Sequence, residues 1–431
     1  MTLAWRVRVG SLVLMALSLG ATPAAAAATP RLDGRFGEGG IARMRFRIPL
    51  DQADTLPLRP VRQPDGKLLL AAARGEFHGN SQIVLARFTR RGRRDPTFGH
   101  GGRERLGMRW NFQPHAVHVL PDGRILVLGA AGFAASLYPF PHQFALIRLL
   151  PDGSRDRTFG TNGFVTWNPP WRPETTYMNT RPGLFVRQSD GRLLAAGEVE
   201  EQRADQPGTS ARRTVFVRFN PDGSVDTSFG RAGVVEGPDG PDLFWGWAAL
   251  PDGRMVGLAS RNEGFDTPAW WLHRFTADGA LDRAFGQNGS VQVGMNGFSR
   301  LIELVAASDG SVVVIGNDQG ETAAVLRRIL PGGQLDAGFG TACGGRTLRA
   351  FSRGGAAATS DGGAFVTATT FVISGRRQDS LFVRYDAHGC VADQPLRVRA
   401  VSAGPPLLQR HRMVLVGASY DKGLALIRIR R

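Results

Sequence analysis

Residues that could carry out acid–base or metal chemistry are few in this sequence and poorly grouped. His115 and His118 lie three positions apart, and on a β-strand this spacing points the two side chains to opposite faces, where they cannot share a metal ion. Glu303 is the one clear acid in the segments expected to face a central axis. No G-x-S-x-G motif and no D-x-D-x-D-G calcium loop is present. The sequence therefore predicts no catalytic residues, no metal site and no cofactor.

Aromatic and arginine side chains offer binding chemistry instead. Tryptophan and tyrosine rings stack on sugars and on peptide side chains, and guanidinium groups bind carboxylates and phosphates through two hydrogen bonds. The candidate ligand-binding residues are Trp110, Trp167, Trp171, Tyr177, Trp245, Trp247, Trp270, Trp271, Arg59 and Arg187. Two alternatives stay open: the tryptophans could fill gaps between packed sheets, and the arginines could contact only water.

The first 28 residues have the features of a secretory signal. Arg6 and Arg8 precede a short apolar run, and alanines that suit an A-x-A cleavage site follow it. The sequence thus predicts an exported protein, periplasmic or secreted, without a membrane span. In that oxidising setting the two cysteines, Cys343 and Cys390, are expected to form one disulfide bond.

The net charge is +16, and Lys67 and Lys422 are the only lysines among the 53 basic residues. The arginines are spread along the chain instead of forming a basic arm, which argues against nucleic acid as a partner. Solvated strand faces and a surface that binds polyanions both account for this charge.

One phrase recurs with a period of about sixty residues. "LDGRFGEGG" at Leu32 returns as "RDPTFGHGG", "RDRTFGTNG", "VDTSFGRAG", "LDRAFGQNG" and "LDAGFGTACGG". Two further phrases lie between the copies, "LPDGRILVLG" and "FALIRLLPDG" being examples. Pro-Asp-Gly favours a tight turn, and the apolar runs beside it are short and β-branched, as in strands.

These phrases predict four strands per repeat: one before the first "DG", a second after it, a third ending in "RF", and an outer strand after "FGxxG". Four antiparallel strands repeated around an axis make a propeller blade. The expected fold is all-β, a single seven-bladed β-propeller over residues 29–431 with four antiparallel strands per blade. An open solenoid or another number of blades is the alternative.

The chain ends also bear on the fold. The repeats begin with an outer strand and stop after a third strand, so one blade is left in two pieces. Pairing residues 32–46 with residues 424–429 would complete that blade and cover an open sheet edge. We therefore expect the N-terminal outer strand to close the ring on the C-terminal blade.

The repeat phrases resemble those of the bacterial delta-60 repeat β-propeller family, and the blade order is similar to that of NHL-repeat propellers. The resemblance extends over nearly all of the chain after the signal. It implies the propeller fold, and it implies no established activity.

The strand order assigns the short "PDG" turns to one face of the ring and the long, varied connections to the other. Function is expected on the long-loop face, because variable loops on a rigid scaffold carry most binding sites. The predicted function is an exported, non-catalytic binding or scaffolding module, acting as a monomer on an acidic glycan, an envelope polymer or a protein partner. The alternatives are a hydrolase or lactonase-like enzyme acting at the central axis and a purely structural envelope protein.

Overall fold

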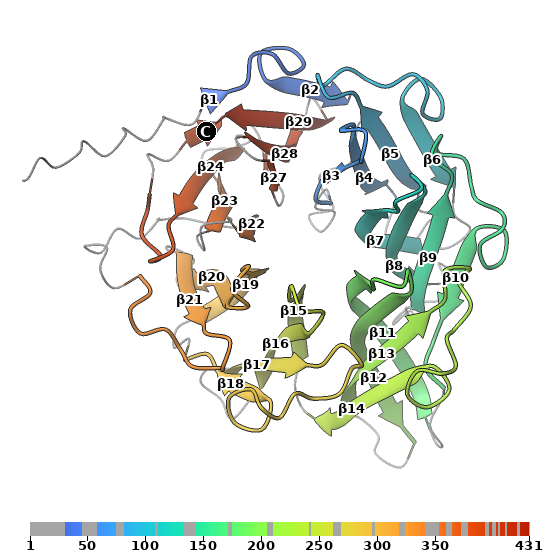
Figure 1. The fold of residues 1–431 in the computed structure, drawn as a ribbon, viewed down its shortest axis with the longest axis vertical. Helices are drawn as coiled ribbons and strands as arrows, with labels where there is room; N and C mark the ends of the chain where they lie inside the picture. Colours follow the sequence, from blue (N-terminus) through green and yellow to red (C-terminus); the bar gives the residue numbers. More distant parts are fainter. Residues whose placement is uncertain are drawn as a thin grey trace, which may run out of the picture.

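A computed structural model describes most of the chain after the predicted signal. The described residues are 31–44, 58–74, 82–107, 111–132, 143–170, 175–204, 210–240, 243–261, 269–294, 298–318, 324–340, 353–358, 364–371, 378–392, 396–398, 402–403, 406–409, 412–419 and 423–430. Every element assigned in these residues is a β-strand, and the strands stand around a central axis (Figure 1). These residues contain no helix with the length and apolar character needed to cross a membrane.

Six antiparallel sheets are each built from consecutive strands of the chain. The first three contain β3 (Val61–Arg62), β4 (Leu68–Arg74), β5 (Gln82–Phe88) and β6 (Arg103–Gly107); β7 (Asn111–Val119), β8 (Ile125–Gly132), β9 (Gln143–Leu149) and β10 (Phe164–Trp167); and β11 (Thr175–Arg187), β12 (Leu193–Arg203), β13 (Ser210–Phe219) and β14 (Val234–Gly240). The next three contain β15 (Leu243–Ala249), β16 (Met255–Arg261), β17 (Ala269–Phe275) and β18 (Ser290–Gln292); β19 (Phe298–Ala306), β20 (Val312–Asp318) and β21 (Ala324–Ile329); and β22 (Arg353–Ala358), β23 (Ala364–Phe371), β24 (Gln378–Tyr385) and β25 (Leu396–Val398).

The remaining sheet joins the two ends of the described chain. It contains β1 (Arg31–Leu32), β2 (Ile41–Met44), β26 (Ser402–Ala403), β27 (Leu407–Gln409), β28 (Arg412–Ser419) and β29 (Gly423–Arg430). Both β1 and β2 pair with β29, with Leu32 opposite Ile429 and Met44 opposite Leu424. The predicted closure by the N-terminal segment is therefore confirmed.

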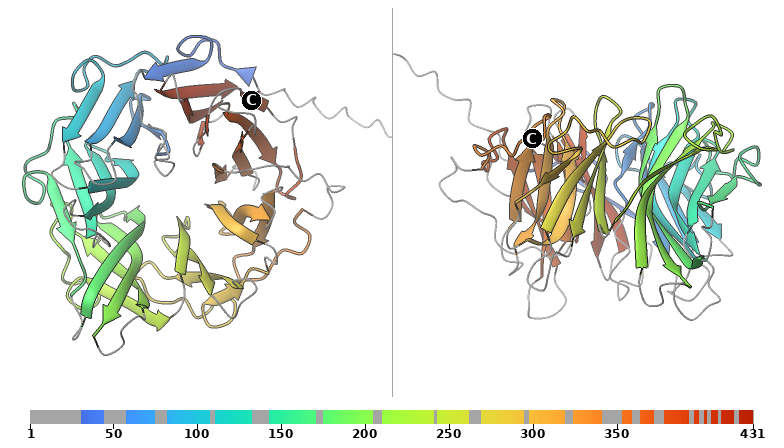
Figure 2. Two further views of the ribbon diagram at one scale, coloured as in Figure 1. Left: turned by 180° about the vertical axis from the view of Figure 1, so that it is seen from behind. Right: turned by 90° about the horizontal axis from the view of Figure 1, so that it is seen from below.

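The expected seven-bladed propeller with four antiparallel strands in each blade is wrong. Only six blades come from consecutive strands, and one of these, β19–β21, has three strands among the described residues. The closing sheet is a composite of six strands, because its outer position is divided between β1 and β2 and its inner position between β26 and β27. The strand order expected within a repeat is confirmed in sheets such as β7–β10, where β7 lies nearest the axis and β10 is outermost (Figures 1 and 2).

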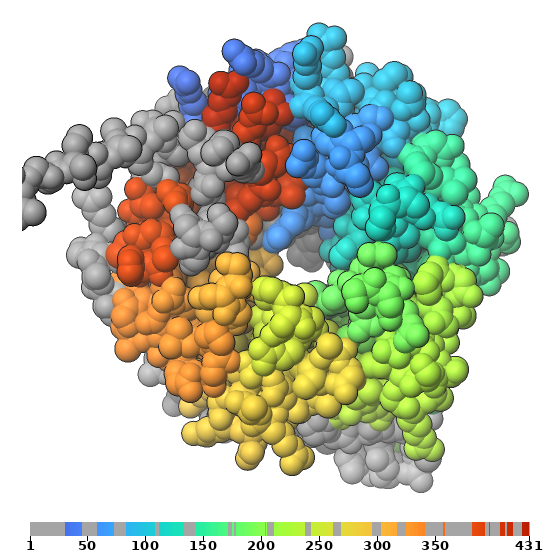
Figure 3. Space-filling view, in the orientation of Figure 1, coloured from blue at the N-terminus to red at the C-terminus, as the bar shows by residue number. Residues whose placement is uncertain are grey.

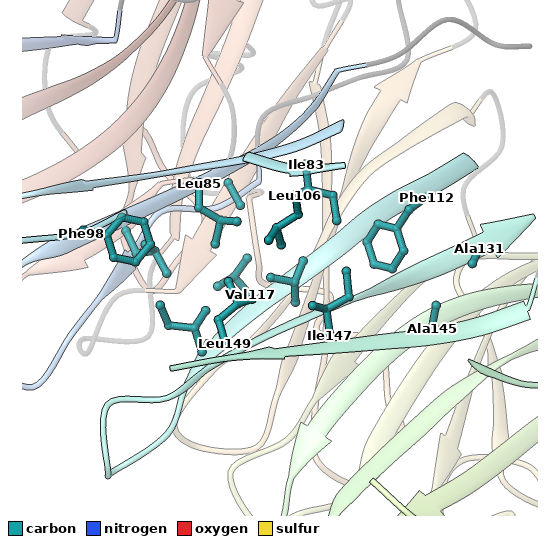
Figure 4. Close-up of a cluster of buried hydrophobic side chains, with 14 residues drawn as sticks. Ile83, Leu85, Phe98, Leu106, Phe112, Val117, Ala131, Ala145, Ile147 and Leu149 are labelled. Atoms are coloured by element: carbon teal, nitrogen blue, oxygen red, sulfur yellow. The ribbon is translucent and has the colours of Figure 1, made fainter. Parts of the chain in front are cut away.

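The hydrophobic core lies between sheets and not inside any one of them. Figure 4 shows one cluster, in which Leu85 and Leu106 of one sheet meet Val117 and Ile147 of the next, all of them buried. Comparable clusters fill the other junctions between neighbouring sheets. Strands such as β8 are buried along their whole length, because the sheet that contains them has a neighbouring sheet on each of its two faces.

The recurring phrase builds a clamp on the short-turn face. In five repeats, an arginine at the end of the third strand donates through Nε to the aspartate eight residues later, and Arg428 donates in the same way to Asp33 at the other end of the chain, all over 2.7–2.8 Å. The same guanidinium stacks over the phenylalanine of the "FG" pair, with 4.3–5.1 Å to the ring centroid. The six sets of three residues are Arg87–Asp95–Phe98, Arg148–Asp156–Phe159, Arg218–Asp226–Phe229, Arg274–Asp282–Phe285, Arg328–Asp336–Phe339 and Arg428–Asp33–Phe36. Many of the arginines are thus structural.

The clamp also ties each sheet to the next. Arg87 donates to the carbonyl of Pro151, in the turn of the following repeat, and Arg148 donates to that of Pro221. The junction between β11–β14 and β15–β18 differs. There the carbonyl of Ala277 accepts from the Gln188 side-chain amide at 3.3 Å, and no cross-sheet bond from Arg218 occurs among the described contacts.

Candidate functional site

Trp245 is the most exposed large hydrophobic side chain in the described residues, at 53%. It lies near the start of β15, on the long-loop end of the innermost strand of its sheet (Figure 1). The pairing of β15 with β16 skips one residue between Phe244 and Gly246, so Trp245 occupies a β-bulge. Bulges redirect side chains at strand ends, and this one presents an indole ring to solvent.

The exposed ring of Trp245 is held in place. Its Nε1 donates to Oγ of Ser260 at 2.8 Å, and its centroid lies 6.1 Å from that of Trp270. Trp270 is only 4% exposed and packs in the core between β15–β18 and β19–β21. Trp245 is therefore a rigid aromatic platform on a buried base, which lowers the entropy lost when a ligand stacks on it.

Side chains on the other face of β15 fill the junction with β11–β14, the junction that lacks a cross-sheet bond from Arg218 among the described contacts. The Trp247 ring stacks on Phe244 with centroids 4.6 Å apart and meets Phe216 edge-on at 6.1 Å. Phe275 completes this group, 4.9 Å from Phe216. This aromatic wedge fills the junction at which Arg218 makes no cross-sheet hydrogen bond among the described contacts.

A charged quartet lies beside the wedge, at the long-loop end of β11, β12 and β13. Arg181 and Arg212 approach Glu200 at 3.1 and 3.0 Å, and they approach Glu198 at 3.8 and 3.5 Å. Glu198 also accepts a hydrogen bond from the backbone N–H of Phe244 at 2.8 Å. The quartet therefore fastens β12 to β15, directly before Trp245 in the chain.

The carboxyl group of Glu198 is 2% exposed, and burial raises its pKa. The Phe244 N–H and the charges of Arg181 and Arg212 oppose this rise without cancelling it. The pKa is raised although two cations are near, because they compensate only part of the cost of removing the carboxylate from water. Glu198 thus places a carboxyl group with a raised pKa against the backbone of Phe244, the residue before Trp245.

The opposite face of the same sheet carries a second charged group. Arg213 lies between Glu201, at 2.7 Å, and Glu236. Arg213 and Glu201 are both fully buried, so this group is structural. It stiffens the extended strands that hold the quartet.

The structure places the predicted tryptophans in different environments. Trp167 is half-buried and contacts Phe144 at 5.6 Å, in the core between β7–β10 and β11–β14. Trp271 is half-buried beneath the Arg261 guanidinium, which lies 5.3 Å from the ring centroid. Trp247 and Trp270 pack at junctions as described above. Trp110 and Trp171 lie outside the described residues, and Tyr177 lies on β11 with its backbone opposite Gln202.

The predicted arginines do not join Trp245. Arg59 forms an ion pair with Glu303 on β19 at 3.7 Å, across the ring from its own sheet (Figure 1). Arg187 is exposed at the last position of β11, beside a short turn and at the opposite end of that strand from the quartet. Arg181 and Arg212 are connected through Glu198 to the backbone of Phe244, the residue before Trp245.

Cys390 lies in the turn after β24, where its N–H donates to Asp386 at 2.9 Å. Cys343 lies outside the described residues, so the disulfide stays a prediction. In the part of the chain that the structure describes, no three His, Cys, Asp or Glu side chains gather as a metal site would require.

Sequence reasoning missed Glu198, Glu200, Arg181 and Arg212, because residues 198–213 were expected to form a long connection. Most of that segment is strand, in β12 and β13. The signal was present: in an antiparallel hairpin centred on 206, Glu200 faces Arg212 and Glu201 faces Ala211. Opposite charges placed across a ladder stabilise strand pairing.

Four segments of the chain match a family model described as "Domain of unknown function (DUF5122) beta-propeller", at residues 63–98, 120–159, 188–229 and 307–339. The chain carries β-propeller repeats. The match leaves the narrower delta-60 assignment as an expectation. A search of curated proteins found no match.

The solved structures that resemble this chain include an arabinanase, an arabinofuranosidase and a WD40 domain. The α-L-arabinanase of Penicillium chrysogenum, complexed with arabinobiose, shares 14% identity over 90% of this chain and 96% of that chain, with a TM-score of 0.43. The GH93 α-L-arabinofuranosidase of Fusarium graminearum, with arabinobiose, shares 12% identity over 91% and 97%, with a TM-score of 0.43. The WD40 domain of SCAP from fission yeast shares 8% identity over 90% and 97%, with a TM-score of 0.37. Likeness at this level assigns no activity.

Proposed function

We propose that this protein is an exported, non-catalytic β-propeller that binds an acidic glycan on its long-loop face. The observation that carries the proposal is Trp245, which is 53% exposed and fixed by its hydrogen bond to Ser260. Flat indole rings stack on sugar rings, and the cost of ordering the ring has already been met within the fold.

An arginine connected through Glu198 to the residue before Trp245 supports an acidic ligand. The side chain of Arg181 is 47% exposed, and Glu198 links it to Phe244, the residue before Trp245. A carboxylate on a bound sugar would compete with Glu198 and Glu200 for the guanidinium group. Such a contact would add selectivity for acidic over neutral sugars, because guanidinium and carboxylate match in geometry.

The test is titration of the protein with short uronic acid oligosaccharides while tryptophan fluorescence and binding heat are recorded. We expect Trp245→Ala to weaken binding about two- to tenfold, since aromatic contacts of this kind contribute about 0.5–1.5 kcal/mol. Trp245→Phe should retain part of the affinity, and Leu335→Ala, another exposed apolar position, serves as the control. Equal affinity of Trp245→Ala and wild type for every oligosaccharide would contradict the proposal.

An enzymatic function is the second candidate, and the raised pKa of Glu198 favours it. A raised pKa makes a carboxyl group a better proton donor to a leaving group. If the protein cleaves a glycan, Glu198→Gln should remove turnover while binding persists. Hydrolysis products that form at the same rate with Glu198→Gln would exclude this residue as the acid.

A further inference from the structure

The turn between β5 and β6 differs in charge from the equivalent turns. Residues 89–94 read "TRRGRR", whereas residues 150–155 read "LPDGSR", residues 220–225 read "NPDGSV" and residues 276–281 read "TADGAL". Arg91 thus occupies the position that Asp152, Asp222 and Asp278 occupy in the other repeats. Four arginines thus stand in a turn that contains an acid in these three repeats and no charge in residues 330–335, which read "LPGGQL".

The backbone of this turn is the same as in the other repeats. Thr89 N–H donates to Arg93 at 2.7 Å and Gly92 N–H donates to Thr89 at 2.9 Å, and Leu150 and Gly153 make the matching bonds at 2.7 and 2.9 Å. The arginines are therefore not required for the turn geometry, for which Pro-Asp-Gly is the preferred sequence. Their charge needs another explanation.

These side chains are exposed and largely unused within the fold. Arg90 donates to the backbone carbonyl of Asp65. The guanidinium groups of Arg91, Arg93 and Arg94 are exposed, and no ion pair involves them among the described residues. Structural arginines of the clamp, such as Arg87, are instead buried and paired.

The turn lies against the point where the chain ends meet. Gly37 N–H donates to the carbonyl of Arg91 at 2.8 Å, and Arg428 donates to that of Arg90 at 2.7 Å. Figure 3 shows N-terminal atoms in blue and C-terminal atoms in red side by side at the top of the molecule. The basic turn is therefore hydrogen-bonded to the closing sheet and lies beside it.

The closing sheet is itself basic. Asp33 is fully buried and accepts from Arg428 at 2.8 Å and Arg430 at 2.7 Å, with Arg412 at 3.5 Å. Three cations therefore share one carboxylate. We define the basic closure surface as the exposed or partly exposed side chains of Arg31, Arg35, Arg90, Arg91, Arg93, Arg94, Arg412 and Arg430. Glu38 is the exposed carboxylate of residues 31–44.

We propose that the basic closure surface binds a linear acidic polysaccharide by charge, on the short-turn face and separately from Trp245. Clustered guanidinium groups attract polyanions and pair with carboxylate or sulfate groups through two hydrogen bonds. The one aromatic residue in residues 31–44 and 89–94, Phe36, is buried, so these segments offer no exposed stacking platform of the kind that single-stranded nucleic acid uses. This inference does not depend on the proposed function.

The test grafts the turn of another repeat onto this one. Arg90→Pro, Arg91→Asp and Arg93→Ser together recreate the "PDGSR" turn of residues 151–155, which the fold already accommodates. The control combines Arg157→Ser, Arg231→Ser and Arg283→Asp, all exposed positions in other repeats, and changes the net charge by the same amount. Binding of labelled heparin and polygalacturonate is measured for wild type, both triple variants and Trp245→Ala, with a circular dichroism melt of each.

We expect the grafted variant to lose about tenfold or more in affinity for the polysaccharides, while the control and Trp245→Ala stay close to wild type. Wild-type binding should fall steeply between about 0.05 M and about 1 M salt, where the screening length shrinks to about 3 Å. Equal losses in the graft and the control, or no wild-type binding at low salt, would overturn the proposal. Duplex DNA of equal charge that binds as tightly as heparin would overturn the assignment to polysaccharide.

A measurement on the wild type covers the case in which the graft fails to fold. Arginines are modified with hydroxyphenylglyoxal with and without heparin, and the modified sites are located by mass spectrometry. Protection of Arg91 and Arg93 but not of Arg231 supports the surface. Equal protection at all three positions contradicts it.

Discussion

At the scale of single residues, the repeated aspartate is the centre of the clamp. Asp156 is buried and accepts from Arg148 at 2.7 Å, with Arg124 at 3.7 Å. The same aspartate also accepts from the backbone N–H and the hydroxyl of Thr158. These contacts explain why the recurring phrase keeps an Asp three residues before the Phe of Phe-Gly: one carboxylate holds the turn and the arginine at the strand end.

Removing one such carboxylate should be costly. In Asp156→Ala, the buried Arg148 guanidinium loses its partner, and we expect the free energy of unfolding to fall by about 3–5 kcal/mol. Asp122→Ala is the control, because Asp122 is half exposed and meets Arg124 at 3.4 Å on the surface, where a pair contributes about 0–1 kcal/mol. Urea denaturation of both variants checks this, and equal losses would contradict the clamp.

The clamp also predicts a stability that depends on acid pH. Burial alone would raise the pKa of Asp95, but hydrogen bonds from Thr97 and Lys67 and the charge of Arg87 outweigh burial and lower the pKa to about 2. A hydrogen bond from Ser228 is the main cause that lowers the pKa of Asp226 to about 2.

Because an unfolded Asp titrates near 3.9, these two groups stabilise the fold fully above about pH 4 and lose that contribution as the pH falls to about 2. Urea midpoints measured from pH 7 to pH 2 should therefore drop mainly below about pH 4. An Asp95→Asn variant should show a smaller drop, and an unchanged profile in that variant would remove Asp95 from the explanation.

At the scale of elements, bulges in the inner strands shape the long-loop face. The pairing of inner and second strands skips one residue at His115, Gly183, Trp245 and Ile302. In two of these sheets a glycine of the second strand lies opposite the bulge: an added Cβ would lie 2.0 Å from the carbonyl oxygen of Gln113 at Gly129, and 2.4 Å from that of Arg181 at Gly197. The glycine at the end of "DGRILVLG" thus permits the bulge.

Gly197→Ala should accordingly destabilise the protein by about 1–3 kcal/mol, since backbone must move to admit the methyl group. The new Cβ would also lie 2.8 Å from the Phe144 ring. Gly107→Ala on β6 is the matched control, because nothing lies within 4 Å of its added Cβ. Thermal melts of the two variants compare them directly, and a control that is as unstable as Gly197→Ala would show that the bulge is irrelevant.

At the scale of the whole molecule, closure joins segments from opposite ends of the chain. Residues 41–44 pair with residues 424–427, Asp33 binds Arg428 and Arg430, and Met44 packs with Leu426 in the core shared with β4 and β5. Backbone pairing, charge and apolar burial therefore all contribute to the same junction.

Deletion of residues 31–44 should expose the edge of β29 and uncover this core. Open strand edges pair with other chains, so we expect a lower melting temperature together with concentration-dependent oligomers in analytical ultracentrifugation. The milder Asp33→Asn change removes the charge and keeps the strands, and it should lower stability without oligomers. A deletion variant that stays monomeric and melts like wild type would show that closure is unnecessary.

The sequence by itself determined the parts of this protein that depend on local chemistry. Pro-Asp-Gly turns, alternating apolar runs and the "FGxxG" phrase specify the strands, their order in a repeat and the need for the first outer strand to pair with the last strand. Tertiary structure alone decided the rest, because it depends on which side chains meet across sheets. Trp245 and Trp247 are two residues apart, yet a bulge leaves the first exposed while the second packs against Phe216. Glu198 and Phe244 are far apart in sequence, and only the packing of neighbouring blades brings Oε2 of Glu198 within 2.8 Å of the backbone nitrogen of Phe244.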